Sequence, residues 1–285
     1  MHGGVALTAY LVNESRARRP DLAADPLAQA WIPEADRPGV RALWQEYAEA
    51  VYPHDDLVVA LRGRVIADVL AAALAADPAT VLVVCGAGFS SYPWLLPFPA
   101  ALEVDLPAMA EAKQRRAEEL TAAGTLPARE VVHLGADLGA EADRARVAAA
   151  VRELAAGRPV AYVVEGVLFY LPPRDALAVA GLGAGFGAGG AAVSAVSYWP
   201  AAASGSRVLE AQRAWFRGRQ VPPEASYQTN AELTALFGRP LRDVGPEDLQ
   251  RRYLGGVKVP ESELIPEYVA VAGAGAAGAA GAVAG

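Results

Sequence analysis

The chain has 285 residues, of which 53% are hydrophobic and 20% are charged, a balance that is typical of a globular protein and excludes extensive disorder. Its formal net charge of −7 excludes a strong positive field, so we predict no nucleic-acid partner. The single cysteine, Cys85, excludes an intramolecular disulfide and is typical of a reducing compartment.

The elements predicted along the chain alternate between helices and strands. Residues 8–74 have a helical pattern, with prolines that divide it into shorter helices. The short apolar runs that predict strands are 81–85, 101–104, 131–134, 160–164 and 192–196. The helical patterns between them are 107–123, 141–156 and 173–179. This alternation predicts an α/β fold with a parallel sheet that is covered on both faces.

The rest of the chain is helical over 201–238 and then irregular, with late strands, over 240–272. We therefore predict one domain over residues 1–272. Within it we expect a helical cap (1–75), an α/β core (80–200) and a helical insert after the fifth strand (201–238). The glycine and alanine residues of 273–285 predict a disordered tail.

Two uncharged stretches, 176–200 and 268–285, are long enough to compare with membrane segments. Both consist mainly of alanine and glycine, which contribute little transfer energy. The first residues lack the basic region and apolar core of a secretory signal. We expect a cytoplasmic protein that does not contact a membrane.

Glycines and acidic residues follow successive predicted strands. Gly86 and Gly88 follow the first strand and allow the backbone to approach a ligand closely. Asp105 ends the second strand, where a carboxylate can accept hydrogen bonds from ribose hydroxyls. Asp137 follows the third strand and Glu165 the fourth. Because these strand ends meet at one edge of a parallel sheet, the set predicts a site for a cofactor that contains a nucleoside.

Two other kinds of site fit this loop less well. An NAD site needs a third glycine, and Ser91 stands at that position. A serine hydrolase needs a glycine that closes the nucleophile turn, and the segment from Gly88 to Tyr92 lacks one. The pattern therefore favours a different nucleoside cofactor.

Longer stretches around these residues match a known family. They are Val83–Phe89, Glu103–Pro107, Lys113, Ala136–Leu138 and Glu165–Pro172. Matches nearer the start are Thr8–Ala9, Ser15–Ala17, Asp25–Ala28 and Leu61–Arg64. Over about residues 6–172 the sequence resembles the leucine carboxyl methyltransferase family, including its bacterial polyketide O-methyltransferase branch.

The resemblance implies a class I methyltransferase that uses S-adenosylmethionine, with a Rossmann-like, mostly parallel sheet and a late antiparallel strand. By this match, Arg62 would hold the methionine carboxylate, which suits a guanidinium. Gly86 would contact the methionine and the ribose, and Glu165 would face the methionine amino group or the sulfonium.

The same match places Asp105 on the ribose hydroxyls, with Asp137 and Leu138 around the adenine. The complete predicted cofactor site is Arg62, Gly86, Ala87, Gly88, Asp105, Leu106, Asp137, Leu138 and Glu165. The chain departs from many relatives at Ser90 and Tyr92, where those relatives have Asp and Arg. Substrate contacts of those relatives are therefore not transferred to this loop.

The acceptor substrate is expected to be a small molecule bound by aromatic residues of the cap and the insert. The predicted contacts are Tyr10, Tyr92, Tyr170, Tyr198 and Trp199, with Trp215 and Phe216 as further candidates. We assign no catalytic residue and no metal ligand. His54 and His133 are the candidate general bases, and the pattern around each favours a structural role.

This shortage of bases favours methylation of a carboxylate, which needs none. We therefore expect an O-methyltransferase that forms the methyl ester of a natural product. Two alternatives stay open: methylation of a hydroxyl or phenol, and a cofactor-binding protein of the same fold without methyl transfer. The oligomeric state does not follow from the sequence.

Overall fold

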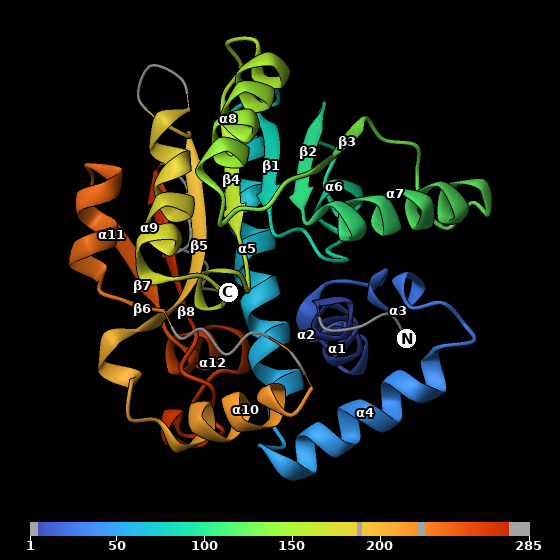
Figure 1. Cartoon of the computed structure of the whole chain (residues 1–285), viewed down its shortest axis with the longest axis vertical. Coiled ribbons are helices and arrows are strands. Elements are labelled where there is room, and N and C mark those ends of the chain that lie inside the picture. The colour runs from blue at the N-terminus through green and yellow to red at the C-terminus, as the bar shows by residue number, and fades with distance from the viewer. Residues whose placement is uncertain (1–4, 187–189, 220, 222–225, 274–285) are drawn as a thin grey trace.

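The computed structural model describes residues 5–186, 190–219, 221 and 226–273, which form a mixed α/β fold (Figure 1). The sheet has the strand order β3-β2-β1-β4-β5-β8-β7, and β6 pairs with β5 outside this row. The strands are β1 (Val81–Cys85), β2 (Ala101–Asp105), β3 (Val131–Gly135), β4 (Val160–Val164), β5 (Val193–Pro200), β6 (Tyr227–Gln228), β7 (Leu241–Val244) and β8 (Tyr268–Gly273). Neighbours from β3 to β5 run parallel, whereas β8 is antiparallel to β5 and β7. The predicted fold class is confirmed.

Strands β1 and β4 form the centre of the sheet. Every residue of both strands is buried, as expected for continuous apolar runs in a sheet with two covered faces. From β1 the chain passes to β2 and β3 on one side, and β4 and β5 lie on the other. The strand order therefore reverses between β1 and β4, and sheets of this kind bind ligands beyond the carboxyl ends of the strands at such a point.

Helices cover both faces of the sheet and one of its ends. They are α1 (Val5–Arg18), α2 (Pro20–Ala23), α3 (Ala28–Trp31), α4 (Arg37–Ala50), α5 (Asp55–Ala76), α6 (Tyr92–Leu95), α7 (Pro107–Ala122), α8 (Glu141–Ala155), α9 (Pro173–Gly181), α10 (Arg207–Arg217), α11 (Asn230–Phe237) and α12 (Pro246–Leu254). Helices α5, α7 and α12 lie on one face, and α8, α9 and α11 lie on the other. Helices α1 to α4 and α10 gather at the end where the parallel strands terminate (Figure 1).

The predicted cap and insert are only partly separate from the sheet. Helix α5, assigned to the cap, packs against β4, β5 and β8, and most of its surface is buried. Helix α11, assigned to the insert, packs against β7 and β8 on the opposite face. Both helices therefore belong to the layers of the core. The single-domain division stays a prediction.

Helix α12 lies in a segment that was predicted to be irregular. Pro246 occupies its first turn, where the missing N–H costs nothing. Gly255 ends it with a φ of +69°, the left-handed conformation that glycine adopts without strain. These start and stop signals are present in the sequence and explain why the segment is helical.

The two uncharged stretches contain ordinary elements of the fold. The first includes part of α9 and strand β5, with residues 187–189 outside the described chain. The second contains β8, and residues 274–285 lie outside the described chain, so the predicted tail stays a prediction. Across the described ranges, no helix combines the length and the apolar character needed to cross a bilayer.

A buried ion pair supports the loop that follows β1. The ammonium of Lys113 on α7 lies 2.6 Å from Oε1 of Glu103 on β2, and the two side chains are 2% and 1% exposed. The same ammonium donates to the carbonyl of Ala87 over 3.3 Å and to the hydroxyl of Ser90 over 3.2 Å. Lys113 therefore connects α7, β2 and the glycine loop.

We expect Lys113→Met to lower the free energy of unfolding by about 3–5 kcal/mol, because it leaves the Glu103 carboxylate buried without a cation. The double variant Lys113→Met, Glu103→Leu should recover most of that loss, since no unpaired charge remains. Denaturant titrations followed by circular dichroism would measure both. A single variant as stable as the native protein would show that the pair does not support the loop.

Candidate active site

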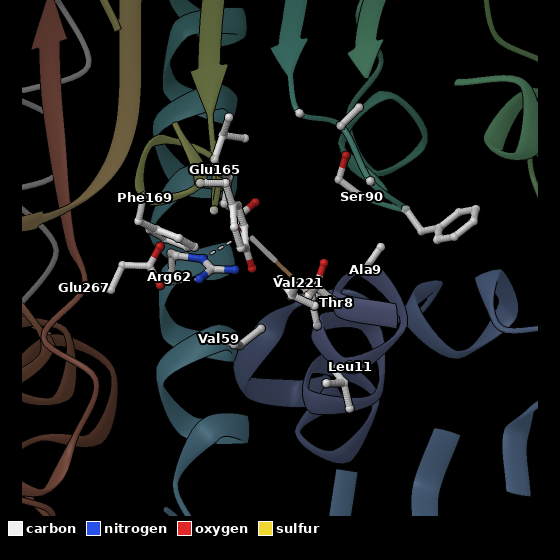
Figure 2. A pocket seen from close by; sticks show the side chains of 18 of the residues that line it. Thr8, Ala9, Leu11, Val59, Arg62, Ser90, Glu165, Phe169, Val221 and Glu267 are labelled. Carbon is white, nitrogen blue, oxygen red and sulfur yellow. Dashed lines mark hydrogen bonds and ion pairs between the residues drawn. The ribbon is translucent and has the colours of Figure 1, made fainter. Parts of the chain in front are cut away.

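A cavity of about 420 Å³ lies beyond the carboxyl ends of β1, β2 and β4. Its wall also includes residues of α1, α5 and α10 and of the segment before β8. Figure 2 shows the strands pointing toward this space, with α1 facing them. The volume falls within the range of roughly 300–1,000 Å³ that is usual for small-molecule sites.

The loop after β1 presents its backbone to the cavity. Gly86 has a φ of +70°, and a Cβ at this position would lie 2.0 Å from Cγ2 of Val167, so only glycine fits. The N–H of Gly88 donates to Oδ2 of Asp105 over 2.7 Å, and the N–H of Leu106 donates to Oδ1 over 2.8 Å. The loop therefore fixes the Asp105 carboxylate at the end of β2.

The turn after β3 is held in a similar way. Oδ1 of Asp137 accepts the N–H of Gly139 over 2.9 Å, and Asp143 accepts the N–H of Asp137 over 2.8 Å. Arg144 on α8 donates to the carbonyl of Leu138 over 2.8 Å. Asp137 and Leu138 both line the cavity in this fixed turn.

Two arginines and two glutamates form a buried network in the wall. Oε1 of Glu165 accepts from Nη2 of Arg16 over 2.6 Å and from Nε of Arg62 over 2.7 Å. Oε2 of Glu165 accepts from the hydroxyl of Tyr92 over 2.6 Å. Nη1 of Arg62 donates to Oε2 of Glu267, and Figure 2 shows Arg62 between the two glutamates.

The network keeps its members charged. Burial alone would raise the pKa of Glu165, but the charges of Arg16 and Arg62 outweigh it and lower the pKa to about 2. Burial would lower the pKa of each arginine, yet the neighbouring carboxylates raise it above its ordinary value. Near neutral pH Arg16, Arg62 and Glu165 are therefore all charged at this point of the wall.

The structure brings all nine residues of the predicted cofactor site to this one cavity. They come from α5 and from the ends of β1, β2, β3 and β4. Their contact with the cofactor stays a prediction. Arg62 and Glu165 were expected only to contact the methionine, but they also form an ion pair with each other.

Two of the predicted acceptor contacts, Tyr170 and Trp199, line the cavity. Phe169 stacks on Trp199 with the ring centres 4.3 Å apart, and Phe216, one of the further candidates, also lies in the wall. These rings make one side of the cavity aromatic.

The other three predicted contacts, Tyr10, Tyr92 and Tyr198, lie outside the cavity wall, and their contact with an acceptor stays a prediction. Tyr10 stacks on Phe89 with ring centres 5.0 Å apart. Tyr198 packs near Tyr268 in the core on the other side of the sheet, because successive residues of a strand face opposite ways. Tyr92 binds Glu165 from behind the network. Trp215, a further candidate, is also outside the wall.

Neither candidate histidine lines the cavity. His133 stacks on Trp94 and has Nδ1 3.4 Å from Oε2 of Glu103, and burial lowers its pKa to about 4. His54 directly precedes α5 and is half-buried. Within the part of the chain that the structure describes, no cluster of His, Cys, Asp or Glu has the arrangement of a metal site.

Several polar residues of the wall were not predicted. They are Arg16, Tyr47, Asp55, Gln212 and Glu267. Arg16 lies in one of the stretches that carry the family resemblance, so a residue-by-residue reading of that stretch could have found it. Tyr47, Asp55 and Gln212 come from helices, and Glu267 directly precedes β8. The sequence contains no motif that marks these four residues.

Comparison with known proteins gives the family of the chain. The family model described as leucine carboxyl methyltransferase matches residues 5–181, more than half of the chain. The chain belongs to this family. The family uses S-adenosylmethionine as its methyl donor, and this methyltransferase therefore has that cofactor. The bacterial polyketide branch suggested by the sequence is a finer assignment that the family match does not reach.

Solved structures of similar fold support the architecture. A candidate methyltransferase from Thermobifida fusca YX is 18% identical with a TM-score of 0.58, and the match covers 85% of this chain and 91% of that one. A DUF574 family protein from Streptomyces avermitilis MA-4680 is also 18% identical with a TM-score of 0.58, covering 82% and 90%. A search of curated proteins finds no match to the chain.

The residues of the cavity fit S-adenosylmethionine. Gly86 packs directly against Val167 and lines the cavity with its backbone. The wall has five carboxylates and two arginines, and this negative excess suits a cofactor with a sulfonium cation. Asp105 would bind the ribose hydroxyls, and Arg62 with Glu165 would bind the charged groups of the methionine.

We expect Asp105→Ala to weaken binding of S-adenosylhomocysteine by about 1–3 kcal/mol, because the N–H groups of the loop and the ribose hydroxyls both lose their acceptor. Calorimetry would measure the affinity, with Asp77→Ala at the far end of α5 as a control that should bind normally. Unchanged binding by the Asp105 variant would contradict the assignment.

The low pKa of Glu165 predicts a pH dependence of stability. An unfolded glutamate titrates near pH 4.3, so the unfolded chain binds more protons than the folded one at lower pH. The stabilisation is present above about pH 4.5 and is lost as the pH falls through about 2. Between about pH 4.5 and 2, the free energy of unfolding should therefore fall by roughly 3 kcal/mol less in Glu165→Gln than in the native protein. Denaturant titrations at several pH values would measure the free energy of unfolding. If it depended on pH equally in the native protein and in Glu165→Gln, the ion pairing would be contradicted.

Proposed function

We propose that the protein transfers a methyl group to a carboxylate oxygen of a small natural product of polyketide type. The observation that carries this proposal is that no histidine lines the described wall, and that the two glutamates near the methionine end are bound to arginines. Glu165 accepts from three donors and has a pKa of about 2, and Glu267 is paired with Arg62. A carboxylate is ionised near neutral pH and reacts without a general base.

The protein's contribution is mainly position and the exclusion of water. When bound, the cofactor supplies a methyl group on a positively charged sulfur. Displacement at this methyl group is in line, so alignment of the acceptor oxygen supplies much of the rate. Arg62 and Glu165 would hold the methionine end, and Asp105 would hold the ribose. Because these side chains are themselves held by hydrogen bonds, the methyl group would have a fixed direction.

The chemistry of the remaining wall supports a small and largely apolar acceptor. Phe169, Tyr170 and Trp199 face the cavity on one side, and Leu11 and Val221 line it elsewhere. Apolar and aromatic walls bind apolar surface and exclude water from the reacting atoms. An acceptor with a hydrocarbon or aromatic skeleton and one carboxylate satisfies both features.

With a panel of arylalkanoic acids and the corresponding alcohols, we expect methyl esters of the acids as products. The rate with the best acid should stay nearly level from about pH 6 to 9, because a carboxylate is ionised throughout this range. His54→Ala and His133→Asn should retain activity when compared at equal folded fraction. Mass spectrometry of the product and release of S-adenosylhomocysteine would measure both properties.

Two results would contradict carboxylate methylation. A rate that rises with pH, or loss of turnover by 10²-fold or more in one histidine variant, would indicate a hydroxyl acceptor and a general base. Binding of S-adenosylhomocysteine without turnover of any acid or alcohol would indicate a protein of this fold that does not transfer methyl groups.

A further inference from the structure

At the end of the cavity away from the glycine loop lies another buried carboxylate, that of Asp55. Asp55 is the first residue of α5, seven positions before Arg62, and the helical rise of about 1.5 Å per residue places the two roughly 10 Å apart. Asp55 lines the cavity and is 8% exposed. It accepts from the hydroxyl of Ser15 over 2.5 Å and from the hydroxyl of Tyr52 over 2.9 Å.

Asp55 differs from the other buried carboxylates of the cavity. Glu165 and Glu267 are paired with arginines, and Asp105 is held by two backbone N–H groups. In the described chain no lysine or arginine lies within ion-pair distance of Asp55, although Arg62 acts on it from further away. Burial raises the pKa of the Asp55 carboxyl, as expected for a desolvated anion without a cation beside it. Buried charges are normally paired, so a cation at this position would complete the site.

Aromatic rings surround the same position. The rings of Tyr47 and Tyr52 have centres 6.0 Å apart at 80°, and those of Tyr47 and Phe216 have centres 5.9 Å apart at 24°. All three residues line the cavity. A cation within about 6 Å of such rings is attracted to their faces, and cages of this kind recognise ammonium groups.

Gln212 on α10 adds a neutral acceptor. Its Nε2 donates to the hydroxyl oxygen of Tyr47 over 2.9 Å, while its Oε1 is buried without a partner. The Tyr47 hydroxyl lies beside the Asp55 carboxylate, which can only accept, so its proton is directed there and its oxygen accepts from the amide. This arrangement fixes the orientation of the amide and leaves Oε1 available to a donor.

We propose that this end of the cavity binds a protonated amine carried by the methyl acceptor. Asp55 supplies the counter-charge, Tyr47, Tyr52 and Phe216 supply aromatic faces, and Gln212 supplies a hydrogen-bond acceptor. The assignment of the amine to the methyl acceptor rests on the proposed function. The acceptor is then a molecule with its carboxylate near the Arg62 end and an ammonium group roughly 10 Å away.

The test uses the full chain saturated with S-adenosylhomocysteine and four probes measured by calorimetry. Three are 3-phenylpropanoates with an aminomethyl, hydroxymethyl or ethyl group in the para position. The fourth, 4-propylbenzylamine, has the amine without the carboxylate. We expect the aminomethyl probe to bind at least tenfold more tightly than the ethyl probe, with the hydroxymethyl probe between them, and 4-propylbenzylamine to bind detectably.

Variants test whether Asp55, and not another carboxylate, is responsible for the preference for the amine probe. Asp55→Asn should reduce the amine preference to less than threefold while leaving the affinity for S-adenosylhomocysteine unchanged within about twofold. Asp56→Asn is the matched control, because Asp56 is equally buried but is paired with Arg19 outside the cavity wall. Gln212→Glu adds a second carboxylate and should increase the preference. If Asp55→Asn does not fold, this last variant decides.

Equal or tighter binding of the hydroxymethyl or ethyl probe would overturn the proposal. So would an amine preference that persists in Asp55→Asn, no increase in Gln212→Glu, or no binding of any probe. Formation of methyl esters is measured separately. Amine preference without ester formation would contradict the proposed carboxylate methylation and support the amine site. Ester formation without amine preference would support carboxylate methylation and contradict the amine site.

Discussion

The pairing of Arg62 with two glutamates holds together parts of the chain that are far apart in sequence. Arg62 comes from α5, Glu165 follows β4, and Glu267 directly precedes β8. Arg16 brings α1 to the same point through Glu165. A buried charge without its partner costs several kcal/mol, so each of these side chains is stable in place only when the others are present. The position of α1 over the strand ends, and with it the closed form of the cavity, depends on this network.

The carboxylates at the two ends of the cavity differ in their hydrogen-bond and ion-pair partners. At the cofactor end the carboxylates have cationic or backbone partners, and these bonds give fixed directions to Asp105 and Glu165. Such a preorganised site loses little entropy when a ligand binds. At the opposite end Asp55 has only hydroxyl donors, and Gln212 keeps a bare acceptor. The carboxylates of the predicted cofactor end therefore have cationic or backbone donors, whereas Asp55 at the opposite end has hydroxyl donors and no cation beside it.

The sequence predicted the sheet, and its nine candidate cofactor residues line one cavity, because both depend on local patterns. The apolar runs of β1 and β4 and the glycines at 86 and 88 carry their own signals. Only two of the five predicted acceptor contacts line the cavity, and there is a physical reason for this. Whether an aromatic residue such as Tyr198 faces the cavity depends on the register of its strand, and a shift of one position reverses its direction. The partners of Arg62 and the place of Asp55 follow from contacts between segments that are distant in sequence, which spacing alone does not encode.

The place of Glu267 has a consequence for the order in which the protein matures. During synthesis the chain emerges from its N-terminus, so all nine predicted cofactor residues, the last of them Glu165, are made long before Glu267 and β8. Strand β8 then pairs with β5 and β7 and brings Glu267, the second counter-ion of Arg62, into place. Until β8 is in place, the Arg62 guanidinium must stay hydrated or have Glu165, which also binds Arg16, as its counter-ion. The competence of the site is thereby tied to completion of the polypeptide, and a nascent or C-terminally shortened chain would carry the binding motif in an unfinished electrostatic setting.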